Sequence, residues 1–228
     1  MQTHGHRLGV MRIDFISDVA CPWCAVGLHG LQRGLEQLGD EIPVALHFQP
    51  FELNPDLGPE GRDVVTYLSE KYGHSPARIA EIQANIKARG AEVGFAFGPR
   101  TRTWNTFDAH RLLYWAGLQD DAAEPGGHQQ ALKLALLQAY HGQGRSPSSA
   151  EVLLDCVGEA GLDAAEAEAI LASDRFAGEV RALERQWQQT GIRAVPSVVV
   201  DGKHLIQGGQ PPEVYAQTLR EIAARAAA

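Results

Sequence analysis

Apolar and polar residues follow two different periods near the start of the chain. Residues 12–17 alternate polar with apolar side chains of β-branched and aromatic types, which predicts a strand. Leucines then recur at spacings of three and four between residues 28 and 38, which predicts an apolar stripe on one helix. Gly39 follows in the position where glycine commonly ends a helix. A second strand is expected over residues 43–51.

The middle of the chain, from about residue 62 to residue 173, has mostly helical periodicity. Helices are expected over residues 75–90, 105–118, 127–141, 149–160 and 164–172. Ser75, Ser148 and Asp163 are the expected N-terminal caps, the last two with a glutamate at capping-box spacing. Gly90 is the expected stop of the first of these helices.

Strand patterns return only near the C-terminus. A helix is expected between a cap at Asp174 and a stop at Gly191. Two short strands flank Asp201-Gly202, a pair that favours a tight hairpin turn. A last helix is expected over residues 211–226. The order is therefore β-α-β, a helical block, and α-β-β-α.

Composition and charge narrow the class of protein. Hydrophobic residues make up 44% of the 228 residues and charged residues 21%, as in folded globular proteins. The formal net charge is −8 with both signs mixed along the chain, so neither nucleic acid nor a membrane surface is an expected partner. The start lacks the apolar run of a secretory signal, which favours a cytoplasmic location, and residues 1–11 are expected to be a flexible extension.

Two of the three cysteines lie close together, as Cys21-Pro22-Trp23-Cys24, at the start of the first helix. Backbone N–H groups at a helix N-terminus stabilise a thiolate, and this spacing can bring a cysteine pKa from about 8.5 to between roughly 3.5 and 7.5. We therefore expect Cys21 to be the exposed nucleophile and Cys24 to be the resolving thiol. Pro22 suits the first helical turn, and Trp23 is expected to pack beside the pair.

Two other interpretations of the pair remain open from the residues. Zinc binding would have to recruit Cys156 and one of His29, His47 or His110 from scattered places, because the chain has no second C-x-x-C. The pair could also be two ordinary buried cysteines. No metal site is predicted, and Cys156 is expected to be a core residue of a helix.

Pro196 opens the apolar strand "SVVV" and raises a separate question. A proline cannot donate to a sheet ladder, so it requires an edge strand, the beginning of a strand or a cis bond. About 5–6% of X-Pro bonds are cis, so the pattern alone leaves the three possibilities open for Val195-Pro196.

These motifs together resemble a known family. "SDVACPWC" between a strand and a helix, with "AVPSVVVDG" before a hairpin, resembles the thioredoxin-like superfamily, and the helical block resembles its DsbA-type branch. "QPFELNPD", "NTFDAHRLL" and "GIRAVPSVVVDGKHLIQGGQ" are similar to the FrnE family of cytosolic DsbA-like oxidoreductases. That family is related to 2-hydroxychromene-2-carboxylate isomerases and kappa-class glutathione transferases. The likeness runs from about residue 11 to residue 220.

The resemblance implies an α/β fold. A thioredoxin-like domain would comprise residues 12–56 and 174–226, with an inserted all-helical domain over residues 57–173. This is the DsbA-like arrangement.

The resemblance also implies roles for particular residues. Cys21 would attack a substrate disulfide, Cys24 would resolve the mixed disulfide, and Pro196 would lie in cis opposite the sulfurs. Val195 would offer backbone groups to a bound peptide. Protein thiols or small thiols such as glutathione are the implied partners, and no cofactor is implied beyond the cysteine pair itself.

A glutathione-dependent isomerase or transferase acting on an aromatic or polyketide-like compound is the alternative function. Those relatives typically have serine where Cys21 stands, so cysteine here favours redox turnover. Asn105 and His110 match a segment that lies near the active site in the relatives, which makes them candidates for lining the substrate cleft. A helix start and a solvated helix face explain these two residues equally well.

Overall fold

The structure is a computed structural model, and it describes residues 9–122 and 126–226. Residues 1–8 of the expected N-terminal extension lie outside the described residues. Met11 does not belong to an extension, because it begins the first strand, pairs with Val44 and keeps only 5% of its surface exposed. The extension was therefore predicted too long.

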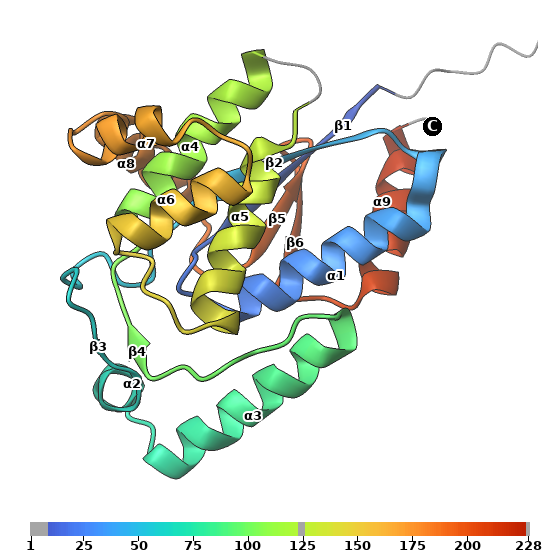
Figure 1. Cartoon of the computed structure of the whole chain (residues 1–228). Coiled ribbons are helices and arrows are strands. Elements are labelled where there is room, and N and C mark those ends of the chain that lie inside the picture. Colours follow the sequence, from blue (N-terminus) through green and yellow to red (C-terminus); the bar gives the residue numbers. More distant parts are fainter. Residues whose placement is uncertain (1–8, 123–125, 227–228) are drawn as a thin grey trace, which may run out of the picture.

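A four-stranded sheet forms the centre of the molecule, with strand order β2-β1-β5-β6 (Figure 1). The strands are β1 (Met11–Ser17), β2 (Val44–Pro50), β5 (Ser197–Val200) and β6 (His204–Gln207). β1 and β2 are parallel, whereas β5 is antiparallel to both β1 and β6. Asp201 and Gly202 form the predicted turn between β5 and β6, and both have positive φ, 50° and 67°.

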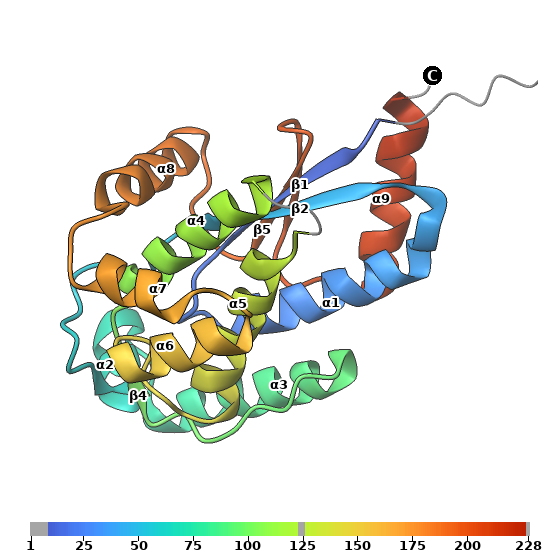
Figure 2. The same ribbon diagram turned by 45° about the horizontal axis from the view of Figure 1, so that its top comes forward.

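Helices cover both faces of this sheet (Figure 2). They are α1 (Pro22–Leu38) and α9 (Pro212–Ala226) on one face and α8 (Ala177–Gln189) on the other. Alternation along β1 decides which face receives which side chain. Ile13 and Phe15 join the core beneath α1 and α9, whereas Ile16 belongs to a smaller cluster against which Trp187 of α8 packs.

The chain between β2 and α8 forms the helical block and a minor two-stranded sheet. Its elements are β3 (Arg62–Asp63), α2 (Val64–Tyr72), α3 (Pro76–Val93), β4 (Arg102–Thr103), α4 (Phe107–Ala122), α5 (His128–Leu137), a π-helical turn (Gln138–Gly142), α6 (Ala150–Glu159) and α7 (Ala164–Leu171). A short 3-10 helix (Gly39–Glu41) follows α1. α4 to α7 share a second apolar core. The implied thioredoxin-like fold with a helical insertion is therefore the fold observed.

Two predicted helix caps are confirmed, and one predicted helix stop is wrong. Ser75 caps α3 and Asp163 caps α7, each accepting hydrogen bonds from backbone N–H groups of the first turn. Gly90 does not end α3, which continues to Val93 and stops at Gly94, with φ at 87°. Phe97 packs directly on Gly90, where a Cβ would lie 2.5 Å from the ring. The glycine therefore serves close packing rather than termination.

Two other predicted caps are displaced by a few residues. α6 begins after Ser149, because the Ser148 hydroxyl donates instead to the Asn105 carbonyl oxygen at 2.7 Å. α8 begins after Phe176 rather than at Asp174, and the intervening residues form a turn closed by a backbone hydrogen bond from Ala177 to Asp174. The two-residue strands β3 and β4 were not predicted, because strands so short have no readable period.

No helix within the described ranges has both the length and the apolar character needed to cross a membrane.

Gly30 provides a test of the packing between α1 and the segment that leads into α9. A Cβ on Gly30 would lie 2.6 Å from the Gln210 carbonyl oxygen, so Gly30→Ala must push backbone segments apart. We expect a loss of about 1–3 kcal/mol in the free energy of unfolding, measured by urea denaturation. Gly158→Ala in α6 is the matched control, because its Cβ would meet nothing within 4 Å. It should gain about 0.5–1 kcal/mol from helix propensity. Equal effects of the two substitutions would contradict this account.

Candidate active site

The cysteine pair lies at the junction between β1 and α1. Cys21 is the N-cap residue of α1, with φ −86° and ψ 112°, and Pro22 occupies the first helical position. The Cys24 N–H donates to the Cys21 carbonyl oxygen at 3.1 Å, which closes the first turn. Both cysteines are free thiols. Trp23, which lies between them in the sequence, is half-buried.

Cys21 is much less exposed than the sequence suggested. It keeps 4% of its surface accessible and Cys24 keeps none. The loop before β5 explains part of this burial, because the Cys21 thiol donates to the Val195 carbonyl oxygen at 3.6 Å. Little of the Cys21 surface is therefore open to a substrate sulfur.

The pKa of Cys21 is lowered from its ordinary value. The largest cause is a hydrogen bond from the Cys24 side chain, and the backbone N–H groups of Cys24 and Trp23 act in the same direction. Burial and the negative charge of Asp18 oppose this shift. Together the hydrogen bonds outweigh both opposing effects, and the backbone N–H groups of the helix start contribute less than the Cys24 side chain.

The pKa of Cys24 is raised well above its ordinary value. Burial is the largest cause, and the interaction with Cys21 adds to it, because a second negative charge beside a thiolate is unfavourable. Of the two sulfurs, Cys21 therefore ionises first. This order is the one that a nucleophile and a resolving thiol require.

Pro196 lies next to this sulfur pair, and the Val195-Pro196 peptide bond is cis, as the resemblance implied. Gly27 in α1 lets the proline ring approach, because a Cβ there would lie 2.9 Å from the Pro196 Cγ. The same Cβ would lie 3.3 Å from the Gly209 Cα. α1, the cis-proline loop and the chain after β6 are therefore in direct contact.

A buried carboxylate organises the loop in front of Cys21. Asp18 is fully buried and accepts hydrogen bonds from the Ala20 N–H at 3.0 Å, the Leu53 N–H at 2.7 Å and the Thr106 hydroxyl at 2.7 Å. His110 Nε2 lies 3.5 Å from the same carboxylate. Burial alone would raise the pKa of Asp18, but the interaction with His110 and the backbone donors lower it below its usual range. Asp18 is therefore ionised.

Comparison with known proteins bears on this geometry. A family model described as a DSBA-like thioredoxin domain matches residues 12–220. The chain belongs to the DsbA-like family. A probable DsbA oxidoreductase from Streptomyces coelicolor is 35% identical, with a TM-score of 0.84 over 92% of this chain and 89% of that one. Comparison with curated protein sequences finds no significant match.

More distant structures share the DsbA-like fold. A cytosolic disulfide reductase, DsbM from Pseudomonas aeruginosa, solved with GSH, is 18% identical with a TM-score of 0.60 over 92% of this chain and 98% of that one. A 2-hydroxychromene-2-carboxylate isomerase is 14% identical with a TM-score of 0.66 over 95% of this chain and 96% of that one. At these identities the likeness concerns the fold alone.

The two candidate cleft residues have other positions in this DsbA-like chain. Asn105 accepts a hydrogen bond from the Phe107 N–H at 2.8 Å at the start of α4, and its amide donates to Glu52. His110 keeps 2% of its surface exposed and lines a hollow of about 270 Å³ with Lys133. α4 turns His110 inward, so its ring borders this hollow and the Asp18 carboxylate.

Sequence reasoning missed Lys133, which lies on α5 and keeps 1% of its surface exposed. The described residues offer its ammonium no hydrogen bond or ion pair closer than 4 Å. Burial lowers the pKa of Lys133, whereas the negative charges of Cys24, Asp18 and Cys21 act in the opposite direction. Its positive charge in turn favours the Cys24 thiolate. A lysine within a helical pattern gives no sequence signal of burial, because most lysines lie on a solvated face.

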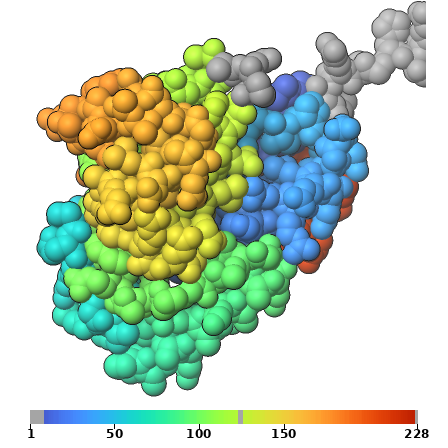
Figure 3. Space-filling view, in the orientation of Figure 1, coloured from blue at the N-terminus to red at the C-terminus, as the bar shows by residue number. Residues whose placement is uncertain are grey.

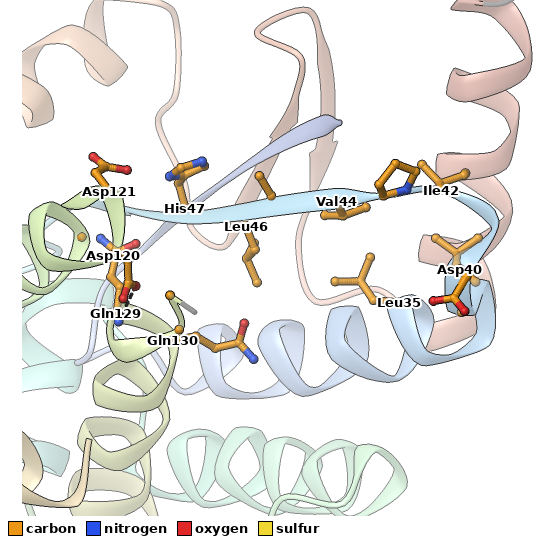
Figure 4. A pocket seen from close by; sticks show the side chains of 17 residues that line it. Leu35, Asp40, Ile42, Val44, Leu46, His47, Asp120, Asp121, Gln129 and Gln130 are labelled. Carbon is orange, nitrogen blue, oxygen red and sulfur yellow. Dashed lines mark hydrogen bonds between the residues drawn. The ribbon is translucent and has the colours of Figure 1, made fainter. Parts of the chain in front are cut away.

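Two further features lie apart from the sulfurs. A hollow of about 800 Å³ runs along the free edge of β2 toward α5, and Val44, Leu46 and Gln129 are among its lining residues (Figure 4). None of its lining residues belongs to the Cys-Pro-Trp-Cys motif. Cys156 is buried in the core of the helical block, and burial raises its pKa to about 11. Within residues 9–122 and 126–226, no three His, Cys, Asp or Glu side chains gather as metal ligands would.

Replacing Cys24 tests the largest cause of the lowered pKa of Cys21. Cys24→Ala removes the donor that stabilises the Cys21 thiolate, so the pKa of Cys21 should rise. The pH dependence of the alkylation rate of Cys21 measures this change. Cys156→Ala serves as the control and should leave the Cys21 profile unchanged. An unchanged profile in Cys24→Ala would leave the backbone N–H groups as the main cause.

Lys133→Met tests the buried ammonium. The substitution keeps an unbranched side chain but removes the charge that favours the Cys24 thiolate, so the pKa of Cys24 should rise further. Closure of the Cys21–Cys24 disulfide from a mixed disulfide should then require a higher pH, which rapid mixing at several pH values can follow. Lys203→Met, in the turn after β5, is the matched control. If both variants close the bond with the wild-type pH dependence, Lys133 does not act on Cys24.

Proposed function

We propose that this DsbA-like chain is a thiol-disulfide oxidoreductase that uses Cys21 as nucleophile and Cys24 as resolving thiol. The single observation that carries the proposal is the position of Cys21 at the N-cap of α1, with Cys24 one turn later and the Val195 carbonyl oxygen 3.6 Å from the Cys21 sulfur. The pKa of Cys21 is lowered and that of Cys24 is raised, which agrees with these roles. Family membership and the likeness to a probable DsbA oxidoreductase support it.

The exchange between the protein dithiol and a substrate disulfide needs no further reactant to balance its atoms and electrons. The Cys21 thiolate attacks one sulfur of a substrate disulfide, the substrate S–S bond breaks, and the other substrate sulfur leaves as a thiolate that takes up a proton. Cys24 then loses its proton and attacks Cys21, which releases the second substrate thiol. The protein pair is oxidised to a disulfide while the substrate is reduced to two thiols, and every step is reversible.

The Val195 carbonyl connects ionisation to substrate binding. It accepts from the Cys21 thiol while that thiol is protonated. A thiolate cannot donate, so ionisation frees this carbonyl to accept an N–H from an extended peptide, as in strand addition. Pro196, the next residue, has no N–H to donate.

Protein thiols or small thiols such as glutathione are the proposed partners, and the cysteine pair is the only redox group proposed. The Pseudomonas DsbM, described as a cytosolic disulfide reductase and solved with GSH, supports a small-thiol partner and a cytoplasmic location. The structural likeness to a 2-hydroxychromene-2-carboxylate isomerase keeps a glutathione-dependent isomerase or transferase as the second candidate.

Serine substitutions separate the roles of the two cysteines. Cys24→Ser should accumulate mixed disulfides with substrate and lose dithiol turnover, because no second sulfur can release Cys21. Cys21→Ser should form no mixed disulfide at all. Non-reducing mass spectrometry and an insulin reduction assay measure these outcomes, with Cys156→Ser as an active control. Full turnover in Cys24→Ser would favour the glutathione-dependent second candidate instead.

A further inference from the structure

A pocket of about 310 Å³ opens beside the cysteine motif. Its walls come from Pro22 at the start of α1, from α3, and from the segment before β4. α3 packs along α1 on this side of the molecule, as Figure 1 and the space-filling view in Figure 3 show. Apolar groups, including Ile86 and Phe97, supply much of the lining. The pocket is therefore close enough to the reacting sulfur to hold part of a substrate.

The charge of this pocket is opposite to that of the whole protein. Lys87 and Arg100 line it, and none of the described residues in its walls is acidic. The chain as a whole carries a formal charge of −8. By contrast, Asp40, Asp120 and Asp121 lie in the walls of the larger hollow along β2, where the described lining contains no lysine or arginine. Of these two cavities, the pocket beside Pro22 is therefore the one that favours an anion.

Arg100 is held in place rather than free in solvent. Its Nη2 donates to the Ala20 carbonyl oxygen at 3.2 Å, its Nε donates to the Tyr140 hydroxyl at 3.3 Å, and the guanidinium lies 5.6 Å from the centre of the Tyr140 ring. Among the described residues it pairs with no carboxylate. A fixed guanidinium without a carboxylate partner is prepared to bind one.

A second donor in the pocket lacks an acceptor. Gln83 on α3 lines the pocket, and its Nε2 is shielded from solvent without a hydrogen-bond partner among the described residues. The two arginines of α3, Arg78 and Arg89, form ion pairs with Glu81 and Glu92 of their own helix. Lys87 and Arg100 have no such carboxylate partner among the described residues. An oxygen acceptor from a ligand would satisfy the Gln83 amide.

Two contacts join the pocket to the loop that presents the reacting sulfur. Ala20 directly precedes Cys21, and its carbonyl oxygen accepts the hydrogen bond from Arg100. Pro22 directly follows Cys21 and lines the pocket. The residues on both sides of Cys21 therefore contact the pocket or its guanidinium.

We propose that the pocket formed by Pro22, Gln83, Lys87 and Arg100 binds a carboxylate of the disulfide substrate, a few bonds from the sulfur that Cys21 attacks. This inference rests on the proposed function and narrows its substrate class to acidic disulfides. The carboxylate belongs either to a small molecule or to an acidic residue beside a cysteine in a peptide. The chemistry in the pocket is the same in both cases.

The experiment compares three small disulfides of similar size with the reduced full-length chain. They are dithiodipropionate (anionic), 2-hydroxyethyl disulfide (neutral) and cystamine (cationic). The rate of oxidation of the cysteine pair is divided by the rate of a small dithiol with the same probe, which removes the intrinsic effect of probe charge. The normalised rate should be about tenfold higher for the anionic probe than for the cationic one. Added salt should reduce this preference.

Variants locate the preference in the pocket. Lys87→Met should lower the ratio of the anionic to the cationic rate about two- to fivefold, and Arg100→Met should bring this ratio close to one. Lys87 is exposed, so Lys87→Met keeps the test informative even if Arg100→Met fails to fold. Lys203→Met removes the same charge from a turn at the other end of the sheet, since Val200 pairs with Ile13 and Ser197 with Ile16. It should leave the ratio unchanged.

A second comparison, with peptide disulfides, identifies the source of the carboxylate. Two peptide disulfides that differ only in Glu or Gln beside the cysteine are compared in the same way, and preference for either the anionic small probe or the Glu peptide supports the proposal. Equal normalised rates for all charges, or a preference that survives both Lys87→Met and Arg100→Met, would overturn it while leaving the proposed function intact. If none of the disulfides oxidises the pair, the proposed function itself fails.

Discussion

The buried carboxylate of Asp18 is the constraint on which the rest of the site depends. Donors from three separate segments meet on it: the Ala20 N–H of its own loop, the Leu53 N–H after β2, and the Thr106 hydroxyl before α4. A buried charge without such donors would be very costly, so these segments must stay together in the folded state. The loop that presents Cys21 at the start of α1 is thereby fixed to both the sheet and the helical block.

This arrangement carries an electrostatic cost that the rest of the site offsets. The negative charge of Asp18 opposes the Cys21 thiolate, yet hydrogen bonds from the Cys24 side chain and from the first turn of α1 still lower the pKa of Cys21. Lys133 contributes a buried positive charge that favours the thiolate of Cys24, the less acidic sulfur. The two cysteines thus differ in ionisation because they meet different charges and donors, although they are only one helical turn apart.

The helical block does more than cover one side of the sheet. It supplies the buried Lys133, from α5, and Arg100, whose guanidinium donates to the Ala20 carbonyl oxygen, from the segment between α3 and β4. The thioredoxin-like part supplies the helix start, Val195 and the cis-proline loop. Reactivity of the sulfur is therefore built mainly from the geometry of a strand-helix junction, whereas the positive charges of Lys133 and Arg100 come from the insertion.

The sequence by itself determined the features that depend on neighbouring residues. The strand before the cysteine motif, the helix start at Pro22, the turn at Asp201-Gly202 and the cap at Asp163 follow from interactions within a few positions, and all were predicted correctly. Only the tertiary structure decided which residues are enclosed by segments far away in the chain. The near-complete burial of Cys21, the position of Lys133 and the contact between Gly90 and Phe97 are of this kind. Local periodicity carries no information about them, because burial is set by the packing of distant elements against each other.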